Sequence, residues 1–160
     1  MKTAGIDIAS AGYGSLAFAV NGRPVRALLW KPADKRDSAA TRIEDYYKWL
    51  RFRLNIFAPD IVAVEELAVF MNKPTIRALA RHEGVALLAA KQSGAIVLSP
   101  SVGQSRSVVL GDGRLSKDDA WVWFRKLYPD FKFAHKTAGG TDQMDALTHA
   151  LAAPTILERR

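Results

Sequence analysis

The chain has 160 residues and a mass of 17.6 kDa, and 49% of its residues are hydrophobic, so we expect one domain over residues 1–160 with a core of its own. It contains no cysteine, which excludes disulfides, thiolate metal sites and cysteine nucleophiles. No apolar run approaches the ~20 residues of a membrane span and no secretory signal is visible, so we expect a cytoplasmic protein without a membrane partner. The net charge of +7 favours a polyanionic partner, with nucleic acid as the first candidate.

The first thirty residues predict three strands. Residues 3–9 have the composition of a buried strand, and a second apolar run covers residues 15–20. Asn21-Gly22 is typical of a tight hairpin turn, so we expect a third strand at about residues 24–30, antiparallel to the second.

The middle of the chain predicts alternating helices and strands. A helix should run from about Ser38 to Phe57, followed by a short parallel strand in the sequence IVAVE. Alternation along that strand puts Glu65 on the face of Ala63, and Glu66 on the other face.

The rest of the chain predicts three more helices and a fifth strand. Thr75 is expected to cap a helix that ends near Ser93, and AIVLSP supplies the strand. Residues 99–116 are polar and contain glycine, as in a mobile loop that faces a substrate. Ser116 should cap the next helix, and the last is expected between Thr141 and Pro154. Hairpin strands followed by alternating elements indicate an α/β fold with a mixed sheet flanked by helices.

Four carboxylates are the main functional signal. Asp7 lies within an apolar strand, Glu65 ends the strand IVAVE, and Asp142 and Asp145 share one face at the expected start of the last helix. Each has an alternative explanation: a hydrogen-bonded structural aspartate, a strand-end acid that reaches solvent, and acids that stabilise the first turn of a helix. Several acids aimed at one core region are better explained by a cation that neutralises them.

Mg²⁺ is the cation that such oxygen ligands favour, with Mn²⁺ as the other candidate. Two ions roughly 4 Å apart would activate water and stabilise the leaving oxygen of a phosphodiester. The sequence therefore predicts metal-dependent hydrolysis of nucleic acid.

The order of motifs resembles the RuvC-type Holliday-junction resolvases of the RNase H-like nuclease superfamily over nearly the whole chain. The motifs are GIDIASAGYG, PDIVAVEE, GVALLAA, SKDDA and DQMDALTHALA. The family pattern has an aspartate in the first strand, a glutamate ending the fourth strand, and D-x-x-D-A near the C-terminus. Asp7, Glu65, Asp142 and Asp145 match this pattern in order and spacing. The resemblance implies an RNase H-like sheet of five strands, with strands one to three antiparallel and the later ones parallel.

The resemblance also assigns residues to DNA. In the family, basic residues before the last acidic pair bind and polarise the scissile phosphate, and Arg106 and Lys117 match them, although Arg106 stands where the family suggests lysine. Arg114 lies in the same basic segment. An aromatic after the glutamate stacks at the junction centre, and Phe70 is near that position, with a core side chain as its alternative. Glu66 is expected beside the ligands or on the surface.

The resemblance further implies a homodimer. The helix expected from Thr75 to Ser93 is similar to the one through which such resolvases pair, and two symmetric active sites suit two cuts in a four-way junction. His149 lies one turn after Asp145 and could approach the metals, but a surface histidine is the commoner case.

The leading hypothesis is a Mg²⁺-dependent endonuclease that resolves Holliday junctions or other branched DNA and leaves a 5′-phosphate and a 3′-hydroxyl. It would act at the nucleoid of a bacterium, or in the host cytoplasm if the protein is viral. The alternative is a non-catalytic protein of the same fold that binds branched DNA. The intact acid set argues against this, because negative charge in a DNA cleft gives a pure binder nothing. An ATP-binding protein of the actin and sugar-kinase fold is a third hypothesis, but it would need a second domain and a second phosphate loop.

Overall fold

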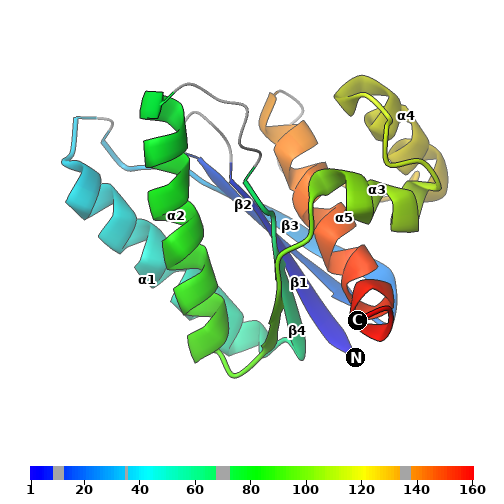
Figure 1. Cartoon of the computed structure of the whole chain (residues 1–160), viewed down its shortest axis with the longest axis horizontal. Helices are drawn as coiled ribbons and strands as arrows, with labels where there is room; N and C mark the ends of the chain where they lie inside the picture. The colour runs from blue at the N-terminus through cyan, green and yellow to red at the C-terminus, as the bar shows by residue number, and fades with distance from the viewer. Residues whose placement is uncertain (9–12, 35, 68–72, 134–137) are drawn as a thin grey trace.

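The computed structural model describes residues 1–8, 13–34, 36–67, 73–133 and 138–160. These form one mixed sheet with the strand order β3-β2-β1-β4-β5 (Figure 1). Strands β1, β2 and β3 pair antiparallel, whereas β4 and β5 run parallel to β1, as the resemblance implies. The bounds are β1 Lys2–Ile8, β2 Gly14–Val20, β3 Arg23–Trp30, β4 Ile61–Val64 and β5 Ile96–Leu98.

Helices cover both faces of the sheet. Helices α1 and α2 lie on one face, and α5 crosses the other with α3 and α4 beside it (Figure 1). Among the described residues no helix is long and apolar enough to cross a lipid bilayer. The bounds are α1 Ala39–Phe57, α2 Lys73–Gln92, α3 Val102–Leu110, α4 Lys117–Leu127 and α5 Ala138–Glu158, so α2 begins two residues before its expected cap, Thr75.

The hairpin between β2 and β3 confirms the turn prediction. Asn21 has φ 49° and Gly22 has φ 74°, the pair of positive values that a type I′ turn requires. The backbone of this turn matches the right-handed twist of the strands, so β2 and β3 can pair antiparallel immediately on either side of it.

Helix α1 also begins and ends as predicted. The Ser38 hydroxyl accepts a hydrogen bond from the Thr41 amide at 3.1 Å, which satisfies one of the free N–H groups of the first turn. Tyr46, Leu50 and Leu54 recur at helical spacing and are fully buried against the sheet.

The segment predicted as a mobile loop contains a helix, α3, and that prediction was wrong. Ser101 caps it, because the Ser101 hydroxyl accepts from the Gln104 amide and the Gln104 side chain accepts from the Ser101 amide. Gly111, with φ 85°, ends it in the left-handed conformation. The capping box and the terminal glycine were visible in the sequence, but the polar composition of the segment hid them.

Helix α5 is longer at both ends than predicted. It begins at Ala138 rather than after a cap at Thr141, and it continues through Pro154 to Glu158. Proline removes one helical hydrogen bond, but packing compensates: Ala153 is fully buried against residues of β4 and β5. Tertiary contacts therefore extend the helix past the residue expected to end it.

Candidate active site

Gly5 brings α5 into direct contact with β1. A Cβ atom at this position would lie 1.9 Å from the Ala146 carbonyl oxygen and 2.5 Å from the Ala150 amide nitrogen. Only glycine permits so close an approach of two backbones. Side chains two residues apart in a strand share a face, so Asp7 also points toward α5.

Glu65 lies at the level of Asp7. Ala63 is opposite Gly5 in the parallel register, and the Glu65 amide donates to the Ile6 carbonyl oxygen at 2.9 Å, which prolongs the ladder beyond β4. Alternation then places Glu65 on the α5 face, as predicted, whereas Glu66 is exposed.

Asp142 and Asp145 complete the group from α5, and each is paired with a cation. The Lys117 ammonium lies 2.5 Å from Asp142 Oδ1 and 3.7 Å from Asp145 Oδ2. The Arg106 guanidinium donates to Asp145 Oδ1 at 2.9 Å and to the Leu115 carbonyl oxygen at 2.8 Å. Ser116 caps α4, as predicted, and so fixes the position from which Lys117 reaches the acids.

The pKa of Asp7 is raised by burial and by the other three acids. Burial raises it well above 3.8, a hydrogen bond with Glu65 adds to the rise, and repulsion by Glu65, Asp145 and Asp142 raises it further. Burial also disfavours the ionised form of Glu65, but a hydrogen bond with Asp7 and the interaction with His149, whose Nε2 lies 3.7 Å away, outweigh it and lower the Glu65 pKa. Asp7 is therefore the more readily protonated of the two acids.

Asp145 and the neighbouring Lys117 respond to the same balance of burial and charge. Burial raises the pKa of Asp145, and attraction by Arg106 and Lys117 only partly offsets the rise. Burial lowers the pKa of Lys117, but its hydrogen bond and its attraction to Asp142 outweigh this, so its pKa is raised. Two cations thus face four carboxyl groups, which leaves the group short of positive charge.

His149 belongs to this group, and the prediction of a surface histidine was wrong. Its side chain is fully buried, with Nδ1 2.7 Å from the Ser105 hydroxyl and Nε2 3.7 Å from Glu65 Oε2. The pair was missed because Ser105 lies on α3, the helix that the sequence did not predict. The only available signal was the helical spacing of His149 after Asp145.

The residues predicted to meet DNA lie in different environments. Arg106 is not the exposed cation of a loop, because only 9% of its side chain is exposed and Asp145 engages it. Lys117 is half exposed at the acids. Arg114 is exposed and pairs with Asp112 rather than with the acids. Phe70 lies outside the described residues.

The donor chemistry fits a divalent cation. All four side chains offer carboxylate oxygens, the ligands that Mg²⁺ and Mn²⁺ prefer, and the group lacks positive charge. Within the described residues, however, no three acids or histidines already surround one point as the ligands of one ion would. Lys117 and Arg106 hold Asp142 and Asp145, so these carboxylates would have to reorient toward an ion.

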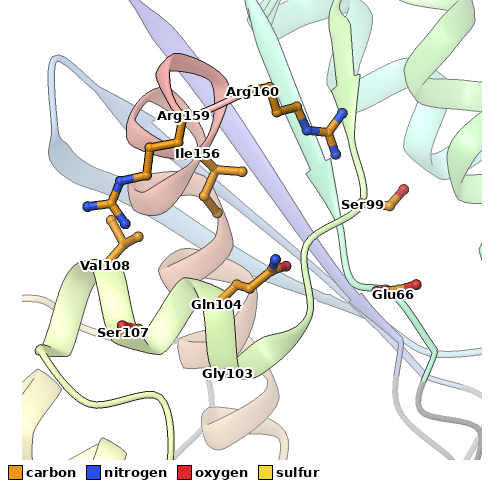
Figure 2. Close-up of a pocket in the computed structure, with 9 residues that line it drawn as sticks. All are labelled: Glu66, Ser99, Gly103, Gln104, Ser107, Val108, Ile156, Arg159 and Arg160. Atoms are coloured by element: carbon orange, nitrogen blue, oxygen red, sulfur yellow. The ribbon is translucent and has the colours of Figure 1, made fainter.

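A surface pocket of about 530 Å³ adjoins this region (Figure 2). Glu66 and Gln104 line one side of it, and Arg159 and Arg160 line the side at the end of α5. None of the four acids lines it, so the pocket is a neighbour of the candidate site and not the site itself.

The family model for crossover junction endodeoxyribonuclease RuvC matches residues 5–152. This chain belongs to the RuvC family. The RuvC of Caldanaerobacter subterraneus is 32% identical over 119 residues, which are 73% of this chain and 72% of that protein. The RuvC of Bartonella quintana is 27% identical over 157 residues, which are 97% of this chain and 90% of that protein.

Solved RuvC structures confirm the predicted RNase H-like fold. The structure of Thermus thermophilus RuvC has a TM-score of 0.74 at 25% identity, covering 97% of this chain and 96% of that chain. The RuvC of the same organism in complex with a Holliday junction substrate has a TM-score of 0.77 at 22% identity, with the same coverage. The fold class and the family predicted from the motifs are therefore confirmed.

Proposed function

We propose that the chain is a structure-selective endonuclease that resolves Holliday junctions, using divalent metal ions held by Asp7, Glu65, Asp142 and Asp145. The convergence of these four carboxyl groups at one end of the sheet carries the proposal. Membership of the RuvC family and the junction-bound structure of a relative support four-way DNA as the substrate. The net charge of +7 would add salt-dependent affinity for the DNA backbone.

The four acids would contribute to metal binding in two different ways, according to the elements that carry them. Two Mg²⁺ or Mn²⁺ ions at the acids would activate water and stabilise the leaving oxygen of the phosphodiester. Asp7 and Glu65 are fixed by β1 and by the end of β4, and so supply the rigid half of the ligand set. Asp142 and Asp145 supply the half that a cation must draw away from Lys117 and Arg106.

Lys117 is proposed to turn toward the scissile phosphate when metal ions take over its carboxylate partners. Its side chain is 46% exposed, so it can leave Asp142 without breaking a packed core. Arg106 is buried and contributes by holding Asp145. A contact between Arg106 and phosphate stays a prediction, and so does a contact between the exposed Arg114 and DNA.

A homodimer is proposed to place two such sites on one junction. Helix α2 presents Leu88 to solvent, 49% exposed, on the helix that the family resemblance assigns to pairing. Light scattering after size exclusion tests this: a mass of about 35 kDa, twice 17.6 kDa, is expected, and a monomer at working concentrations would contradict it.

The test of function is cleavage of a labelled synthetic four-way junction with Mg²⁺, Mn²⁺ or EDTA, beside duplex and flap DNA. Asp145→Asn should bind the junction but not cut it. Asp118→Asn, at an exposed acid in the first turn of α4, should cut normally and is the matched control. Paired metal-dependent nicks near the branch point support the proposal. Binding without cleavage in either metal would favour the non-catalytic junction binder, and preferential cleavage of flaps would keep the mechanism but change the substrate.

A further inference from the structure

His149 occupies the layer directly beneath the acids. The His149 Cβ lies 2.9 Å from the position that a Cβ on Gly5 would take. Gly5 precedes Asp7 by two residues on the same face of β1, so His149 packs beside Asp7 and farther from the strand end. Helical side chains lean toward the N-terminus of their helix, which on α5 is the end that carries the acids. The ring therefore rises from below toward Glu65, and its Nε2 ends 3.7 Å from Glu65 Oε2.

The contact with Ser105 fixes how this ring is oriented. The Ser105 hydroxyl is fully buried and lies 2.7 Å from Nδ1. A neutral ring with its proton on Nδ1 would turn the Nε2 lone pair toward a carboxylate oxygen, which is repulsive. A hydroxyl that donates to Nδ1 leaves the proton on Nε2, facing Glu65.

We propose that His149 is a positioning residue that holds the Glu65 carboxylate in place for metal binding, with Ser105 holding the ring. The inference rests on the proposed function, because it concerns the same ligand set. Nε2 has no hydrogen-bond partner within the described residues at the present spacing. A small rotation of the Glu65 side chain would close the gap to a hydrogen bond, so His149 can hold this carboxylate in place while Asp142 and Asp145 reorient toward a metal ion.

Helix α3 then holds both halves of the ligand set. Ser105 reaches Glu65 through His149, and the next residue, Arg106, binds Asp145 directly. One rigid element thus sets the spacing between a carboxylate from the sheet and a carboxylate from α5. The order carboxylate, imidazole, hydroxyl also occurs in nucleophilic triads, but a fully buried Ser105 cannot meet a phosphodiester.

The experiment measures metal binding, which a merely structural role would leave unchanged. Mn²⁺ binding to the full chain is followed by calorimetry and by electron paramagnetic resonance, without DNA. His149→Leu keeps the volume but removes both contacts, so Mn²⁺ affinity should fall by about tenfold, and a cooperative melting transition in EDTA should show that the variant is folded although the buried Ser105 hydroxyl has lost its partner. His149→Gln keeps an N–H near the position of Nε2 and should retain most of the affinity.

Two further variants complete the test. Ser105→Ala frees the ring and should weaken Mn²⁺ binding by a few-fold, and it decides the matter if His149→Leu does not fold. Thr148→Val is the matched control, because Thr148 is equally buried on α5 but its hydroxyl, among the residues that the structure describes, bonds only the Met144 carbonyl oxygen of its own helix. Its Mn²⁺ affinity should equal that of the wild type.

The possible failures are distinct. Wild-type affinity in both His149→Leu and Ser105→Ala would overturn the positioning role and leave the proposed nuclease intact. A wild-type chain that binds no Mn²⁺ at these acids would overturn the proposed metal site, and the role of His149 with it.

Discussion

Replacing Gly5 with alanine tests the contact that assembles the site. The new Cβ would lie 1.9 Å from the Ala146 carbonyl oxygen and 2.5 Å from the Ala150 amide nitrogen, both backbone atoms that cannot rotate away. Helix α5 would have to move off β1 by about 1.5 Å to restore ordinary contact, a change of the kind that costs about 1–3 kcal/mol in a packed core. The same movement carries Asp145 away from Asp7, and a misplacement of about 1 Å can cost about 10²-fold in rate.

Two measurements and one control separate these effects. Urea denaturation should show a lower unfolding free energy, and single-turnover cleavage of a junction should be slowed even where the variant is fully folded. Gly84→Ala is the control for unfolding, because a Cβ there meets nothing within 4 Å and alanine favours the interior of α2 by about 1 kcal/mol; it lies one turn from Leu88 on the helix proposed for pairing, so cleavage is compared with Asp118→Asn. All proteins are compared at one concentration, since a dimer makes apparent stability depend on it. A Gly5→Ala chain as stable and as active as the wild type would refute the close packing of α5 on β1.

Three other predictions follow from the charges of the site. The pKa of Asp7 is higher in the folded than in the unfolded chain, so the protonated side chain stabilises the fold, and this stabilisation is lost as pH rises from about 3.8 through the raised pKa. Asp7→Asn should therefore have a higher melting temperature than the wild type in EDTA at pH 7 and the same one below pH ~4. It should also lose the rise in melting temperature that Mg²⁺ gives the wild type. Lys117→Met removes a cation that competes for Asp142, so calorimetry should find Mn²⁺ affinity raised while cleavage falls; a lower affinity would contradict this. Arg106→Met leaves the buried Asp145 with only the more distant Lys117, at 3.7 Å, and should cost about 3 kcal/mol in denaturation without metal, partly restored by Mg²⁺; unchanged stability would show that the pair contributes little.

Local signals were enough to predict most of the fold. The Asn21-Gly22 turn, the Ser38 and Ser116 caps, and the alternation that separates Glu65 from Glu66 each depend on residues near one another in sequence, and the structure has them as predicted. The order of the motifs identified the family, because it places Asp7 and Glu65 at the ends of two strands that are neighbours in the sheet. Turns, helix caps and strand faces could therefore be predicted, because each depends on residues of the same segment.

The errors share a different cause. Residues 102–110 were interpreted as a loop because of their polar side chains. Two of these, Ser105 and Arg106, instead contact residues of α5 that are about forty positions away in sequence. His149 looked like a surface residue for the same reason, since its two partners come from α3 and from the end of β4. A buried polar residue is recognisable only when its partner is known, and such partners cannot be found within one element.

The true start of α5 bears on why Asp142 and Asp145 are there. As acids in a first helical turn they could be explained by the helix dipole, which acts only over that turn. The helix begins at Ala138, however, and neither aspartate lies in its first turn. The dipole therefore contributes little, and Lys117 and Arg106 offset part of the cost of placing these carboxylates beside Asp7 and Glu65. Under the proposed function a metal ion would offset the rest, and this explanation of the D-x-x-D spacing is preferred to helix stability.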